Sequence, residues 1–108
     1  MITVTIIPRQ YENIYGMMVK KEVNLRRQKK GTPHRTSLKR KNQEKWVHST
    51  YKGWVNLQKC LGGVTLAIVQ SKNLAEEWQL LSSFVGFLDR HFRDSIGSIN
   101  LSYGREDE

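Results

Sequence analysis

Lysine and arginine side chains are unevenly distributed along this sequence of 108 residues. Between Val19 and Lys45 there are eleven of them against two acidic residues, Glu22 and Glu44, so this basic segment has a formal charge of +9. The rest of the chain has seven basic and eight acidic residues, a formal charge of −1. Ammonium and guanidinium groups attract polyanions by releasing condensed counterions. The sequence therefore suggests an anionic partner for one segment of an otherwise neutral chain.

The middle of the basic segment, from about residue 26 to residue 44, has little that could form a core. Leu38 is its only large aliphatic residue, and Gly31 and Pro33 interrupt it. Ordering a backbone costs roughly 1–2 kcal/mol per residue, which so polar a stretch cannot offset by burial. We therefore predict a flexible basic loop over residues 26–44. The basic side chains expected to contact phosphates are Arg26, Arg27, Lys29, Lys30, Arg35, Lys39, Arg40, Lys41 and Lys45.

Two aromatic residues, Tyr51 and Trp54, follow the basic segment and flank Lys52-Gly53. Aromatic rings beside a cationic surface can stack on unpaired bases, at about 1–3 kcal/mol per base. Tyr51 and Trp54 are thus candidate stacking groups. The alternative interpretation of the same two residues is a cross-strand packing pair.

The three histidines, His34, His48 and His91, and the single cysteine, Cys60, give little support to an enzyme. General acid–base catalysis needs two groups within reach of one bond, and no spacing here brings a pair together. Cys60 cannot form an internal disulfide and is interpreted as structural. Residues 62–63 lack the lysine and hydroxyl residue of a phosphate-binding loop. We expect no metal, no cofactor and no catalytic residue.

The elements that must position these residues can be inferred from periodicity. Alternation of apolar and polar residues predicts strands over residues 2–7, 17–25, 45–51, 54–59, 64–70 and 99–103. A helix should begin after Asn73, a capping residue, with Glu76 completing an approximate capping box. Its apolar stripe follows at spacings of three and four residues through Trp78, Leu81, Val85, Leu88 and Phe92.

These elements predict a two-layer α+β domain over residues 1–104, followed by an acidic tail at 105–108. Short connections favour a curved, mainly antiparallel sheet of five to six strands. One long amphipathic helix near the C-terminus covers it, and a final strand follows. The sequence has no apolar run long enough for a bilayer and no start typical of a signal peptide. We therefore expect a cytoplasmic protein without a membrane partner.

The lengths of the turns decide which side chains lie on each side of the sheet. Two-residue turns at 52–53 and 62–63 would place Trp46, Val55, Leu57, Leu66 and Ile68 beneath the helix. The other side would then carry Val47, Tyr51, Trp54, Asn56, Gln58, Thr65, Ala67 and Val69. A slip of one residue would exchange the two sets.

The function expected from these features is that of a small basic nucleic-acid-binding protein. It would contact the phosphates of DNA or RNA with little base specificity. The alternative is a protein-interaction module, such as an adaptor, inhibitor or immunity-type protein, that docks on an acidic protein. Because one helix is too narrow for the whole sheet, that module would be a homodimer, unless the N-terminal strand and residues 11–18 close the sheet within one subunit. Its interface would include Val47, Tyr51, Trp54, Ala67 and Val69.

Overall fold

A computed structural model of the chain describes residues 1–29, 33–35 and 43–104. Its strands are β1 (Ile2–Pro8), β2 (Pro33–Arg35), β3 (Gln43–His48), β4 (Trp54–Lys59), β5 (Thr65–Gln70) and β6 (Ile96–Tyr103). Its helices are α1 (Ile14–Arg27) and α2 (Leu74–Phe92), with short 3₁₀ turns η1 (Leu61–Gly63) and η2 (Arg93–Ser95). Of the predicted phosphate-contacting residues, Lys30, Lys39, Arg40 and Lys41 lie outside the described ranges.

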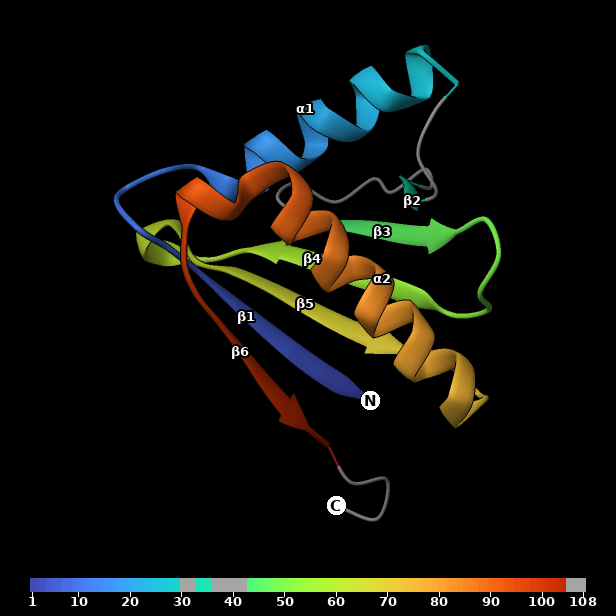
Figure 1. Cartoon of the computed structure of the whole chain (residues 1–108). Helices are drawn as coiled ribbons and strands as arrows, with labels where there is room; N and C mark the ends of the chain where they lie inside the picture. Colours follow the sequence, from blue (N-terminus) through green and yellow to red (C-terminus); the bar gives the residue numbers. More distant parts are fainter. Residues whose placement is uncertain (30–32, 36–42, 105–108) are drawn as a thin grey trace.

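The strands form one sheet in the order β2-β3-β4-β5-β1-β6, in which every neighbouring pair is antiparallel. Both helices pack on one side of it: α2 crosses the sheet obliquely, and α1 lies along the margin formed by β2 and β3 (Figure 1). This arrangement confirms the predicted two-layer α+β class, including the long C-terminal helix and the strand after it. No helix within the described ranges is long and apolar enough to cross a membrane.

The core lies between the helices and the sheet. Ile6 of β1, Met18 of α1 and Leu88 of α2 are completely buried there. Trp46 of β3 packs edge-on against Phe87 of α2, with the ring centroids 5.6 Å apart. One apolar cluster thus joins the sheet and both helices into a single folded unit.

The helix predicted after Asn73 is confirmed, together with its cap. The Asn73 side-chain oxygen accepts hydrogen bonds from the N–H groups of Ala75, at 2.9 Å, and Glu76, at 3.3 Å. These bonds satisfy two of the donors that a helix leaves unpaired at its start.

The strand predicted over residues 17–25 is wrong, because these residues belong to α1. The Asn13 side chain caps this helix by accepting a 3.0 Å hydrogen bond from the N–H of Gly16. Ile14, Met18 and Glu22 recur every four residues and form the buried stripe. Because Glu22 is charged, the sequence did not show that it continues the apolar stripe of Ile14 and Met18. The alternation of apolar and polar residues over 17–25 predicted a strand instead. One helix was expected to be too narrow for the whole sheet. Because α1 packs on the same side as α2, two helices cover it instead.

The predicted two-residue turn at 62–63 is also wrong. The N–H of Cys60 donates a 2.8 Å hydrogen bond to the carbonyl of Val64, so the connection is wider. Gly62 and Gly63 both have positive φ, 72° and 78°, which glycine tolerates better than other residues. Leu57 consequently lies opposite Ala67 rather than Ile68.

This one-residue slip exchanges the sides of β5. Thr65, Ala67 and Val69 are buried beneath the helices, whereas Leu66 and Ile68 lie on the opposite side. Ala67 and Val69 are therefore excluded from the interface on the outer side of the sheet that the sequence predicted.

The hairpin between β3 and β4 is longer than expected. Trp46 lies opposite Val55 rather than Lys59, a shift of four residues. An even shift leaves the side chains of the paired residues on their predicted sides, so Trp46, Val55 and Leu57 are buried as expected. The His48 Nδ1 atom holds the loop by accepting hydrogen bonds from the N–H groups of Thr50, at 2.9 Å, and Tyr51, at 3.3 Å.

Candidate nucleic-acid interface

The side of the sheet opposite the helices, called here the open face, is defined by the strand register. Residues directly opposite each other on neighbouring strands point to the same side of a sheet. One row across the open face consists of Lys45, Asn56, Ile68, Thr3 and Ser102. The adjacent row consists of Gln43, Gln58, Leu66, Thr5 and Asn100. Neither row contains a carboxylate, and most of its members carry amide or hydroxyl groups.

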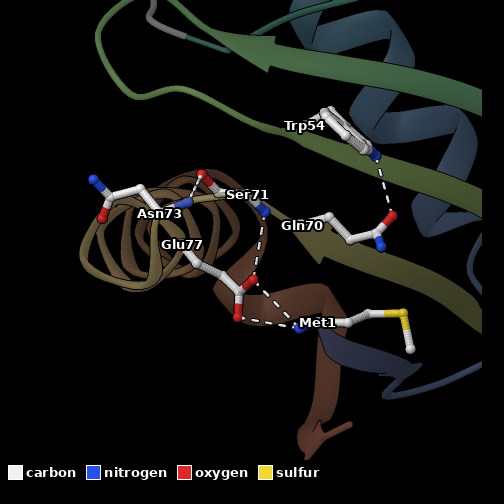
Figure 2. Close-up of polar contacts among 6 residues, drawn as sticks. All are labelled: Met1, Trp54, Gln70, Ser71, Asn73 and Glu77. Atoms are coloured by element: carbon white, nitrogen blue, oxygen red, sulfur yellow. Dashed lines mark hydrogen bonds and ion pairs between the residues drawn. The ribbon is translucent and has the colours of Figure 1, made fainter. Parts of the chain in front are cut away.

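Trp54 lies at one end of the open face. The Lys45 Nζ atom is 4.9 Å from the centroid of the Trp54 ring. The indole N–H donates a 3.2 Å hydrogen bond to the side-chain oxygen of Gln70, its cross-strand neighbour (Figure 2). The ring is half-buried and held at two points, so its orientation does not depend on a ligand.

The start of α2 is tied to the sheet directly beyond Gln70. Glu77 is only 7% exposed. Each of its two carboxylate oxygens lies 3.3 Å from the nitrogen of the Met1 α-amino group (Figure 2). One of these oxygens also accepts a 3.4 Å hydrogen bond from the N–H of Ser71. These contacts join β1, the end of β5 and α2 at one corner of the domain, next to the residue that orients Trp54.

A hollow of about 420 Å³ adjoins the amide-rich part of the sheet. Its lining residues are Gln43, Glu44, Asn56, Leu57, Gln58, Leu66 and Ile68. Glu44 is the one acidic residue among them, and its carboxylate accepts a 3.2 Å hydrogen bond from the Trp46 indole N–H. The hollow is therefore lined mainly by amide and aliphatic side chains.

Three predicted phosphate-contacting residues lie at the end of α1. Arg26 and Arg27 belong to its last turn and Lys29 follows it, and all three side chains are exposed. Arg26 is also 3.9 Å from the buried carboxylate of Glu22, one helical turn earlier. This end of the helix lies beside β2, the strand that contains Arg35, at the margin of the sheet next to β3 (Figure 1).

Tyr51 does not share the open face with Trp54. Its ring stacks on His48 with the centroids 4.6 Å apart and the planes inclined by 31°. Tyr51 also packs against the core on the helical side of the sheet. The structure thus keeps Trp54 as a candidate stacking group and gives Tyr51 a packing role in the hairpin.

The side chains weighed for catalysis are dispersed. His91 packs edge-on against Phe87, 5.0 Å between centroids. Burial lowers the pKa of His91, and the charges of Lys21 and Arg90 lower it further. Cys60 is half-buried, and its thiol lies 3.9 Å from the carbonyl oxygen of Gln58. In the ranges that the structure describes, no three histidine, cysteine, aspartate or glutamate residues are grouped as metal ligands.

Sequence reasoning missed several polar members of the open face. Gln43 and Gln70 were not singled out, and neither were Thr3 and Thr5 of the strand predicted over residues 2–7. Alternation shows which residues share one side of a single strand. Only the register between neighbouring strands shows that these residues share one side of the whole sheet. Comparison with protein-family models, curated proteins and solved structures finds no match to this chain.

Proposed function

We propose that this protein binds nucleic acid, with the basic segment contacting phosphates and the open face turned toward the bases. The observation that carries the proposal is the separation of charge along the chain. Residues 19–45 have a formal charge of +9, whereas all other residues together have −1. So large a local excess exceeds what solubility requires, and polyphosphates are the commonest partners of such a surface.

The positions of the described cations support this proposal. Arg26, Arg27 and Lys29 are exposed at the end of α1, beside the strand that contains Arg35. Lys45 lies on β3, the next strand, and faces the open side of the sheet. A phosphate backbone that followed this margin would pass all of these residues while its bases reached the open face.

The open face is suited to bases rather than to phosphates. Its two rows contain one charged residue, Lys45, and are otherwise amide, hydroxyl and aliphatic groups. Amides offer both donors and acceptors, and Trp54 offers a stacking surface that accepts any base. Stacking requires an unpaired base, which favours single strands, and generic contacts of this kind give little base specificity.

The proposal is tested by titrating generic single- and double-stranded DNA and RNA of unrelated sequence over a range of ionic strength. We expect similar affinities for unrelated single strands and a steep loss of affinity with salt, since each neutralised phosphate adds about −0.7 to the logarithmic slope. Neutralising Lys39, Arg40 and Lys41 together should weaken binding equally for all sequences and flatten the slope. Absence of binding at low salt, or equal affinity of wild type and triple variant, would reject the proposal.

The alternative function, docking on an acidic protein, is favoured by one observation. Val47, Leu66 and Ile68 are aliphatic residues on the side of the sheet away from both helices. An acidic polypeptide such as polyglutamate distinguishes the two functions, because it matches the charge of a nucleic acid but has no bases. Equal affinity for polyglutamate and for an oligonucleotide of the same charge would favour the protein partner.

A further inference from the structure

We propose that two copies of this chain associate through β6, pairing as antiparallel edge strands about a two-fold axis at Leu101. The two sheets would then be continuous, with all four helices on one side. This inference is independent of nucleic-acid binding, because it concerns the edge of the sheet opposite the margin with the basic segment.

Within residues 1–29, 33–35 and 43–104, β6 pairs with β1 alone, and this pairing identifies the β6 backbone groups that β1 leaves free. The N–H of Gly104 donates a 2.9 Å hydrogen bond to the carbonyl of Met1. Hydrogen-bonded and non-hydrogen-bonded pairs alternate along an antiparallel ladder. Ser102 and Asn100 therefore bond to β1 in the same way as Gly104. The N–H and C=O groups of the residues between them, including Leu101, point away from β1 toward the open edge.

The residues with free backbone groups also have exposed apolar side chains. Ile99, Leu101 and Tyr103 lie opposite Ile6, Val4 and Ile2, so their side chains are on the helical side of the sheet. The three β1 partners are buried, yet Leu101 is 42% and Tyr103 63% exposed. A strand paired to this edge would bury these side chains and satisfy the backbone groups at the same time.

One flank of α2 adds to this apolar surface. Leu80 and Ser83 line a small cavity with Trp46, so that side of the helix faces β3. Helical geometry places Leu74 and Trp78 on the opposite flank, the one nearer β1 and β6. Leu74 is 74% and Trp78 57% exposed, which is unusual for residues of their size.

The charge of β6 indicates a second copy as the occupant. Residues 19–45 have a formal charge of +9 and repel the same segment of another copy, but the sequence from Ile96 to Tyr103 contains no charged residue. It also contains neither lysine nor proline, the residues that commonly protect an edge strand from association. The other edge strand, β2, has three residues and includes Pro33 and Arg35.

A two-fold axis at Leu101 makes the strand complementary to itself. Leu101 of each copy faces the same residue, and Ile99 faces Tyr103 in both directions. All three residues then form hydrogen-bonded pairs through the groups that β1 leaves free. Such pairs have Cα atoms about 5.5 Å apart, which a disulfide bond can span.

The first test is the mass of the full chain by sedimentation equilibrium over a wide range of concentration. Wild type should be a dimer, and Leu101→Lys should raise the dimer dissociation constant by roughly 100-fold or more, because it places two charges in contact at the centre of the interface. Leu61→Lys is the matched control, since Leu61 is 96% exposed in η1 on a different part of the surface. It should leave the dissociation constant unchanged.

The second test does not depend on a disruptive substitution. In a Cys60→Ser background, Leu101→Cys should form an intermolecular disulfide on mild oxidation, whereas Leu61→Cys should not. A wild-type chain that stays monomeric at its highest soluble concentration would overturn the proposal. A dimer that survives Leu101→Lys, or one that Trp54→Ala dissociates instead, would overturn it as well. If Leu101→Lys fails to fold, the comparison of Leu101→Cys with Leu61→Cys tests the proposal by itself. Absence of the cross-link at position 101 would then overturn the pairing through β6.

Discussion

Lys45 and Trp54 form a cation–π pair on the open face, with the lysine Nζ atom 4.9 Å from the ring centroid. The two residues are diagonal neighbours on adjacent antiparallel strands, since Lys45 lies directly opposite Asn56. The pair places a positive charge beside an aromatic surface that Gln70 also holds in position. A phosphate and its base could be contacted together at this point.

Replacing Trp54 by alanine should weaken binding of a single-stranded oligonucleotide by about 5- to 150-fold, the loss expected for one stacked base at about 1–3 kcal/mol. Trp54→Phe should keep most of the affinity, because an aromatic ring remains. The measurement is fluorescence anisotropy of a labelled oligonucleotide at low salt. Trp78→Ala is the control, since Trp78 is an exposed tryptophan on α2. Equal losses in the two alanine variants would contradict a specific role for Trp54.

Neutralising Arg26, Arg27 and Lys29 to glutamine should reduce affinity for all sequences alike. If each contacts one phosphate, the logarithmic dependence of affinity on salt should flatten by about 2 for a single strand. The measurement is the binding constant at four or more salt concentrations. A control variant that neutralises Arg9, Lys59 and Lys72 has the same net charge, and all three side chains are exposed. Identical slopes in the two variants would show that only net charge matters.

Glu77→Ala should lower the free energy of unfolding by about 1.5–3 kcal/mol, the range for hydrogen bonds to a charged group. The change removes the contacts of a buried carboxylate with the Met1 ammonium group and the Ser71 N–H. Urea denaturation followed by circular dichroism measures it. Gln79→Ala, an exposed position on the same helix, should change the free energy by less than about 0.5 kcal/mol. Equal stability of the two variants would contradict a structural role for this corner.

Gly53→Ala should be more destabilising than Gly62→Ala. Both glycines have positive φ, 115° and 72°, but a Cβ atom at Gly53 would collide with the carbonyl oxygen of Gln70 while one at Gly62 would meet open space. We expect a loss of about 1–2 kcal/mol at Gly62, from backbone strain alone. The loss at Gly53 should exceed about 3 kcal/mol. Chemical denaturation measures both, and a smaller loss at Gly53 would mean that the hairpin accommodates the methyl group.

The stability of the fold should decrease in mild acid because of His91. Burial, followed by the charges of Lys21 and Arg90, lowers the pKa of His91 below its usual value of 6.5. Between the lowered pKa of His91 in the folded protein and its usual value in the unfolded chain, the unfolded chain therefore binds a proton more readily. The His91 contribution to the free energy of unfolding is fully present above about pH 6.5 and is lost as the pH falls below it.

His91→Gln should remove this part of the pH dependence. The measurement is urea denaturation of wild type and variant at several values between about pH 8 and pH 5. The difference in the free energy of unfolding between the two proteins should change below about pH 6.5 and stay constant above it. A constant difference over the whole range would contradict the prediction.

Local patterns in the sequence were sufficient for most of the elements. Asn73 and the apolar stripe after it predicted α2, and alternation predicted the strands of both hairpins and the last strand. These predictions held because each depends on residues within one turn or one strand of each other. Residues 17–25 were misassigned because Glu22, buried on the inner stripe of α1, does not show its burial in the sequence.

The charge of the basic segment, the long helix and the α+β class follow from the sequence alone, since composition and short-range periodicity are properties of the chain before it folds. The open face required the tertiary structure. The turn at Leu61–Gly63 sets the register between β4 and β5. A shift of one residue in this register decides whether Leu66 or Ala67 faces the core. The pairing of Trp54 with Lys45 and its separation from Tyr51 likewise depend on hairpin length and loop packing. Such choices depend on contacts between distant residues, which the fold as a whole decides.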